Sequence, residues 1–102
     1  FWDNDLSLRR QAIDIIDKKN ILPQIKNMSR VKLEMGCGPR KRISDAITTD
    51  LLDYDCVDIV GESFSVLRHF PDDSVDYVYS FHFVEHLPDL GLYMEEIQRI
   101  LK

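Results

Sequence analysis

The segment from Val31 to Arg42, VKLEMGCGPRKR, constrains the fold more than any other part of the chain. An apolar run suited to a buried strand ends in a Gly-Cys-Gly-Pro turn (residues 36–39), and three cations follow it. Glycines that follow a strand let the backbone approach a ligand closely. The sequence therefore predicts a strand over 31–35 that leads into a ligand-binding turn.

Further strands are predicted after this turn, over 46–50, 57–61 and 75–80, and an amphipathic helix over 90–102. Strands that alternate with helices imply parallel pairing and an α/β layered fold. Only about ten residues separate the glycine turn from the strand predicted over 46–50, which is short for a full crossover helix, so we expect a loop or one helical turn there. The predicted face of the last helix is formed by Leu90, Tyr93, Met94, Ile97, Ile100 and Leu101.

Residues 4–20 are predicted to form a helix before the first strand, capped by Asp5 or Ser7. Pro23 should end it and can open a short second helix. The apolar stripe that supports the first helix consists of Leu8, Ala12, Ile15 and Ile16.

Composition limits the function classes. The chain has 102 residues, of which 44% are hydrophobic, which suits one small globular domain. No apolar run reaches the length of a membrane span, and the polar start does not resemble a signal peptide. The net charge of −5 argues against general nucleic-acid binding. Two cysteines without a C-x-x-C pair favour a reducing, cytoplasmic location.

Two features near the turn each have two interpretations. Residues 40–42 are either a solvated basic loop or a contact for an acidic group. Cys37 is either a nucleophile whose pKa a following helix lowers, or a small side chain that fills a tight turn. The sequence favours the solvated loop and the small side chain.

Two acids beside the turn indicate the ligand. Glu34 would repel a pyrophosphate and favour a cationic ligand, and the third glycine of the dinucleotide motif G-x-G-x-x-G is missing. Asp50 ends the second predicted strand, where a carboxylate can bind both hydroxyls of a ribose. The site therefore favours a ligand with a ribose and a positive charge but no phosphate. S-adenosylmethionine has these features.

The blocks LEMGCGP, TTDLLD, VDIVGES and FPDDSVDYVYSFHFVEHLPD, followed by EEIQRILK, resemble class I S-adenosylmethionine-dependent methyltransferases, especially the type 11 subgroup. The resemblance covers 31–102 and leaves 1–30 as an N-terminal helical segment. It implies a Rossmann-like three-layer sandwich with a mainly parallel sheet, ordered 3-2-1-4 in the part present. It also implies that the sheet is incomplete at its C-terminal side, because further strands follow in the family.

The resemblance assigns most of the cofactor contacts to the first two predicted strands. Glu34, Gly36 and Gly38, with Cys37 between the glycines, would surround the methionine end. Asp50 would bind the ribose hydroxyls. The third glycine of the family's G-x-G-x-G pattern is Arg40 here.

The remaining implied roles fall on later segments. Leu51 would pack on the adenine, and Glu62 would lie near the adenine amine. Ser80 would offer its carbonyl to the ammonium group. His82 would face the methyl group and is the candidate base.

The run His82-x-x-Glu85-His86 also matches the inverzincin zinc-protease pattern. A catalytic zinc needs a third protein ligand, and Pro88 limits any helix here to about one turn. We therefore expect no metal, with Glu85 bonded to backbone and His86 packed in the structure. Phe81 and Phe83 are core residues or line an acceptor pocket, and the core is favoured.

The sequence thus predicts a methyltransferase that acts on an unidentified acceptor, which we expect to be a small molecule. The alternative is a non-catalytic, truncated methyltransferase-like binding module that binds the cofactor poorly or serves as an interaction surface. We expect the natural chain to continue past Lys102. The strand over 75–80 would otherwise lie at an open edge, through which the chain could self-associate.

Overall fold

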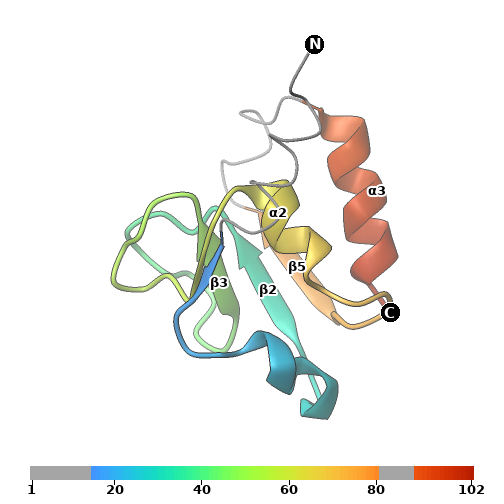
Figure 1. Ribbon diagram of the computed structural model, residues 1–102, viewed down its shortest axis with the longest axis horizontal. Helices are drawn as coiled ribbons and strands as arrows, with labels where there is room; N and C mark the ends of the chain where they lie inside the picture. Colours follow the sequence, from blue (N-terminus) through green and yellow to red (C-terminus); the bar gives the residue numbers. More distant parts are fainter. Residues whose placement is uncertain (1–14, 81–88) are drawn as a thin grey trace.

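The structure is a computed structural model and describes residues 15–80 and 89–102 (Figure 1). Short strands alternate with turns and helices along the chain, as expected for an α/β fold. The elements are strand β1 (Ile16–Asp17), 3-10 helix η1 (Leu22–Asn27), strands β2 (Lys32–Met35), β3 (Ile47–Asp50) and β4 (Ile59–Val60), helix α2 (Ser63–Arg68), strand β5 (Tyr77–Ser80) and helix α3 (Leu90–Ile100).

The strands form one sheet in the order β1-β4-β3-β2-β5. β4, β3, β2 and β5 are parallel, and their register pairs Glu34 with both Thr48 and Tyr79. The predicted order 3-2-1-4 is therefore confirmed for the four parallel strands. The sheet gains β1 as an antiparallel neighbour of β4, which the sequence analysis did not predict.

The helix predicted over 4–20 is wrong at its C-terminal end. Ile16 pairs with Val60 as part of β1, and Ile16 is 58% exposed, so it is not on a buried helical stripe. The Asp17 carboxylate accepts hydrogen bonds from the amides of Ile21 and Leu22, which starts η1. Two adjacent β-branched residues favour a strand where an edge is available for pairing. Residues 1–14 lie outside the described residues.

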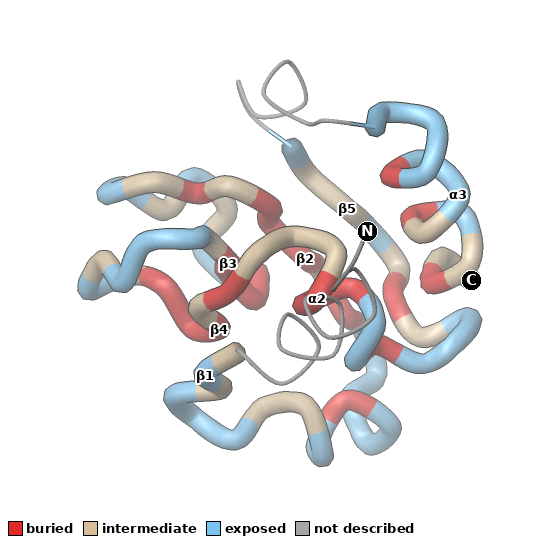
Figure 2. Tube along the Cα trace, turned by 45° about the horizontal axis from the view of Figure 1, so that its top comes forward, coloured by how far each residue is buried: buried red, intermediate tan, exposed pale blue. Residues whose placement is uncertain are grey.

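The core lies on one face of the sheet. Leu33 and Met35 alternate with Glu34 along β2, so the two apolar side chains share a face. They pack in one cluster with residues of α2 and α3, and buried segments of these elements gather there in Figure 2. This cluster consists of Ile25, Val31, Leu33, Met35, Ile47, Ile59, Val66, Leu67, Phe70, Val75, Tyr93, Ile97 and Ile100.

Helix α3 follows the predicted boundaries closely but buries a narrower face. Tyr93, Ile97 and Ile100 are buried, whereas Leu90 and Met94 are about half exposed. The Asp89 side chain caps the helix by accepting a hydrogen bond from the Leu92 amide. The two helices contact each other, and Phe64 of α2 meets the Tyr93 ring edge-on at 6.4 Å between centroids. None of the described helices is long and apolar enough to cross a membrane.

Candidate functional site

The parallel strands bring several predicted site residues to one edge of the sheet. Met35 pairs with Ser80, and Asp50 pairs with Val60, so the carboxyl ends of β2, β3, β4 and β5 align. β3 and β4 lie on one side of β2 and β5 lies on the other, so the connections change direction at β2. Open α/β sheets bind ligands outside the strand ends at such a switch point. The glycine turn follows β2 at this position.

The glycine turn has the backbone geometry that the sequence predicts. Gly36 and Gly38 have φ angles of +65° and +66°, a region that disfavours side chains. The Cys37 amide donates to the carbonyl of Thr49, which fastens the turn to β3. A Cβ atom placed on Gly38 would meet nothing within 4 Å, so this backbone borders open space. The turn therefore leaves room for a ligand to approach Gly38.

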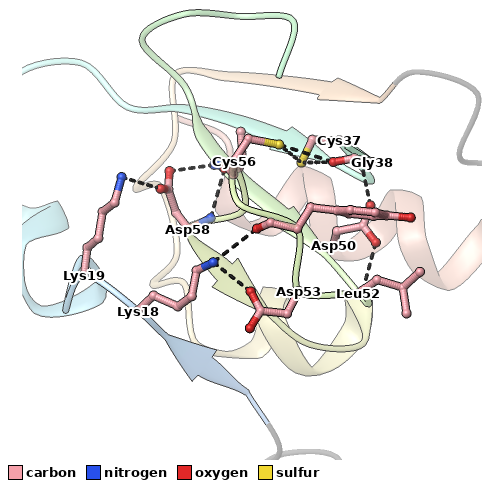
Figure 3. Close-up of polar contacts among 11 residues, drawn as sticks. Lys18, Lys19, Cys37, Gly38, Asp50, Leu52, Asp53, Cys56 and Asp58 are labelled. Atoms are coloured by element: carbon pink, nitrogen blue, oxygen red, sulfur yellow. Dashed lines mark hydrogen bonds and ion pairs between the residues drawn. The ribbon is translucent and has the colours of Figure 1, made fainter. Parts of the chain in front are cut away.

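Asp50 joins the glycine turn to the loop after β3. Its Oδ2 atom accepts a hydrogen bond of 2.7 Å from the Gly38 amide, and its Oδ1 atom accepts one of 3.0 Å from the Leu52 amide (Figure 3). A carboxylate has about four acceptor positions, so each oxygen can accept a further hydrogen bond. Leu51, which lies between Asp50 and Leu52 in the chain, is 66% exposed. A hydrogen-bond acceptor and an apolar surface are thus adjacent, which suits a nucleoside.

No helix begins within residues 36–46, which form turns and irregular backbone. Dinucleotide-binding turns place a pyrophosphate at the N-terminus of the helix that follows. The segment 36–46 therefore lacks that phosphate site and agrees with the loop expected between the glycine turn and the second strand. A nucleoside ligand without a phosphate fits the turn better than a dinucleotide.

Glu34 lies beneath the loop that carries the cations. Its side chain is fully buried, and its carboxylate accepts hydrogen bonds from the amides of Arg42, at 3.1 Å, and Ile43, at 3.0 Å. These contacts fix the path of the loop over the polar face of β2. Glu34 thus holds the loop in position and adds a negative charge under it.

Cys37 and Cys56 lie against each other beside the turn. Their Sγ atoms are 3.8 Å apart, and each lies 3.3 Å from the Gly38 carbonyl oxygen (Figure 3). Burial, followed by the contact with Cys56, raises the pKa of the Cys37 thiol to about 12. Within residues 15–80 and 89–102, no helix begins directly after Cys37, so the alternative in which a following helix lowers the pKa of this thiol is wrong. The interpretation of Cys37 as a small side chain that fills the turn agrees with its 3% exposure.

Glu62 and Ser80 lie at the carboxyl ends of β4 and β5. The Glu62 side chain caps α2 by accepting from the amides of Phe64, at 3.1 Å, and Ser65, at 3.2 Å. Ser80 Oγ lies 2.8 Å from the hydroxyl of Tyr93. Burial raises the pKa of Tyr93, and the hydrogen bond with Ser80 only partly offsets this rise.

The site and core residues predicted in the segment FHFVEH, residues 81–86, are not among those that the structure describes. His82, Glu85, His86, Phe81 and Phe83 lie outside the described residues. Within 15–80 and 89–102, no group of three or more His, Cys, Asp or Glu residues is arranged to hold a metal.

The sequence analysis missed a polar network behind the loop of residues 51–56. Asp58 is buried, and its carboxylate accepts from the Thr48 amide and pairs with Lys19 at 2.9 Å. Lys18 donates to Asp53 at 2.7 Å and to the Tyr54 carbonyl (Figure 3). The only sequence signal was the acid Asp58 within the apolar, strand-like run VDIV, and this signal does not identify Thr48 and Lys19 as its partners.

Comparison with known proteins agrees with the class of protein that the fold and the glycine turn indicate. The fold and the turn define a Rossmann-like domain suited to a nucleoside cofactor. A family model described as a methyltransferase domain matches residues 33–102. The chain belongs to this family, of the class I S-adenosylmethionine-dependent type, which confirms the resemblance. No curated protein and no solved structure gave a match.

Proposed function

We propose that this chain binds S-adenosylmethionine at the glycine turn and transfers its methyl group to an acceptor, which we expect to be a small molecule. The observation that carries the proposal is the contact between Asp50 and the Gly38 amide at the switch point of the sheet. It sets a partly buried carboxylate directly beside backbone that borders open space.

Asp50 is proposed to bind the ribose. Its oxygens already accept two backbone amides, which fix the orientation of the carboxylate, and each has acceptor capacity left for a ribose hydroxyl. Leu51 is proposed to pack on the adenine, since it is exposed next to this carboxylate.

The two acids next to the turn support a cationic cofactor. Glu34 and Asp50 are both acids next to the turn, and no helix N-terminus within 36–46 attracts a phosphate. Glu34 is proposed to act through the loop that it holds, together with its negative charge. Gly36, Cys37 and Gly38 are proposed to contact the methionine end through their backbone.

The proposed roles of the outer residues follow from their strand ends. Glu62 is proposed to lie near the adenine amine, although its carboxylate also caps α2. Ser80 is proposed to offer its carbonyl to the ammonium group, next to Met35 in the register. His82 is proposed as the base if the acceptor needs deprotonation.

The cofactor supplies an activated methyl group on its sulfonium, which needs little further activation. The protein therefore contributes orientation of the acceptor and removal of water. In this chain, the turn and Asp50 are proposed to fix the nucleoside half, so that the methyl group points toward an acceptor near the end of β5.

Isothermal titration calorimetry with S-adenosylhomocysteine tests this proposal. Asp50→Ala should reduce affinity at least tenfold, because a hydrogen bond to a charged group contributes about 1.5–3 kcal/mol and 1.4 kcal/mol is tenfold. Asp55→Ala, an exposed acid in the same loop, is the matched control and should bind like the wild type. Equal affinities for all three proteins would remove Asp50 from the site.

Transfer of a labelled methyl group separates the enzyme from the non-catalytic alternative. The protein should move label from S-adenosylmethionine to a small-molecule fraction of a cell extract. Tight binding of the cofactor without transfer to any fraction would favour a binding module.

A further inference from the structure

The two thiols beside the glycine turn belong to different segments. Cys37 is part of the turn after β2, and Cys56 ends the loop that begins after Asp50. The residues are 19 positions apart, yet their Sγ atoms lie 3.8 Å from each other (Figure 3). Among the described residues both cysteines are free thiols. The two thiol side chains have no part in the function proposed above, in which Cys37 acts through its backbone alone.

We propose that Cys37 and Cys56 are a reversible redox site, which closes to a disulfide and thereby changes the glycine turn. The effect of this disulfide on cofactor affinity rests on the proposed function. Formation of the bond itself does not, because it depends only on the two sulfurs.

The geometry requires a small movement. A disulfide has a sulfur–sulfur distance of about 2.0 Å, so the two atoms must approach by roughly 1.8 Å. Cys37 is 3% exposed and fastened to β3 through its amide, whereas Cys56 is half-buried and follows an exposed loop. We therefore expect most of the movement on the Cys56 side.

The oxidant is a small-molecule disulfide such as oxidised glutathione. Cys56 loses its proton to water, and the resulting thiolate attacks one sulfur of the oxidant, which forms a mixed disulfide and releases one glutathione thiolate that takes up a proton. Cys37 then loses its proton to water, and its sulfur attacks Cys56 Sγ and expels the second glutathione. Two protein thiols are oxidised and one disulfide is reduced to two thiols, so the electrons balance.

The order of the two steps follows from the environment of each thiol. Cys56 is the more exposed of the two residues, so we expect its thiol to meet the oxidant first. The thiol of Cys37, with its pKa raised to about 12 by burial and by Cys56, is almost entirely protonated at neutral pH. Its proximity to the mixed disulfide compensates for this low thiolate fraction.

The consequence for the turn arises at Gly38. Both thiols lie within 3.3 Å of the Gly38 carbonyl oxygen, and both S–H donors disappear when the disulfide forms. The amide of the same residue donates to Asp50. Oxidation should therefore shift Gly38 relative to Asp50 and lower cofactor affinity at least fivefold.

Three measurements on the whole chain, before and after oxidised glutathione, test the proposal. Trypsin separates Cys37, in peptide 33–40, from Cys56, in peptide 43–68, so mass spectrometry should find these two peptides linked. The Gly38 amide resonance should move on oxidation. Affinity for S-adenosylhomocysteine should fall, and dithiothreitol should reverse all three changes. Cys56→Ser should form no link, and its affinity should be the same before and after the oxidant.

Each outcome decides one part of the proposal. Glutathione adducts or links between chains, without a 33–40 to 43–68 link, would overturn the redox site. A link that leaves the Gly38 resonance in place would overturn the coupling to the turn. If the reduced protein does not bind S-adenosylhomocysteine, the proposed function fails, while the mass and the resonance still judge the disulfide and its effect on the turn.

Discussion

The Gly38 amide and the Asp50 carboxylate form a hydrogen bond of 2.7 Å between the ends of two neighbouring parallel strands. Gly38 makes this bond while its backbone is in the left-handed conformation, with a φ angle of +66°. One glycine conformation thus links the turn to the residue proposed to bind the ribose.

Gly38→Ala should destabilise the protein by about 1–2 kcal/mol, because a side chain disfavours the left-handed conformation. The added Cβ meets no atom within 4 Å, so backbone strain alone should cause the loss. Urea denaturation measures the change in unfolding free energy. Gly91→Ala, in the first turn of α3, is the matched control and should be neutral or stabilising. An equal loss in both variants would refute the strain explanation.

Glu34→Gln should weaken the loop over β2. Oε1 of Glu34 accepts from the amides of both Arg42 and Ile43, and Oε2 accepts from Arg42 alone. A glutamine oxygen can take the Oε1 position, but its NH₂ group then takes the Oε2 position and faces the Arg42 amide, donor against donor. We expect a loss of about 1–3 kcal/mol in unfolding free energy, because the new NH₂ group is a donor buried beside another donor. Glu95→Gln makes the same chemical change on an exposed part of α3 and should have little effect. Equal stabilities of the two variants would contradict the role of Glu34.

The sequence predicted the parallel sheet, its order and the glycine turn because those features have local signals. The run VKLEM, the paired glycines and the acid that ends TTD each reflect backbone or strand-end chemistry that neighbouring residues determine. The motif blocks added the family, which the match over 33–102 confirmed.

The missed features depend on contacts between distant segments. β1 forms only where β4 offers an edge, and the Cys37–Cys56 pair exists only because two loops meet. Helix α2 is six residues long, too short for a periodic signal, although Glu62 caps it as an acid can. Local sequence patterns do not predict such contacts between residues that are far apart in the chain.

Asp58→Asn should reduce stability at neutral pH and remove part of its dependence on pH. Burial by itself would raise the pKa of Asp58, but hydrogen bonds from Lys19 and Thr48 and the Lys19 charge leave that pKa below its ordinary value. A lowered pKa adds stability above the unfolded-state value, about 3.9, which is lost as pH falls through the folded-state value. The difference between wild type and variant should therefore be present at pH 7 and shrink below about pH 4.

Denaturant unfolding at pH 7, 5 and 3 measures this difference for Asp58. The lowered pKa values of Asp45 and Asp76 affect both proteins and cancel in the comparison. Lys19→Ala should have a smaller effect at pH 7, about 0–1 kcal/mol, because the lysine is exposed. If the difference in unfolding free energy between wild type and Asp58→Asn stays the same from pH 7 to pH 3, the ionisation of Asp58 does not contribute to stability.

Tyr93→Phe should separate the packing of α3 from its polar contact with the end of β5. The ring is 2% exposed and packs edge-on against Phe64, and phenylalanine keeps both properties. The change removes only the hydroxyl that lies 2.8 Å from Ser80 Oγ. We expect a loss of about 0.5–1.5 kcal/mol in unfolding free energy, the usual contribution of one hydrogen bond. Tyr77→Phe, at a 47% exposed position on β5, is the control and should change stability less.

A double variant tests whether the two hydroxyls act together. Adding Ser80→Ala to Tyr93→Phe should cost little further stability, because the hydrogen bond is already lost. Fully additive losses in that double variant would mean that the two hydroxyls do not act as a pair.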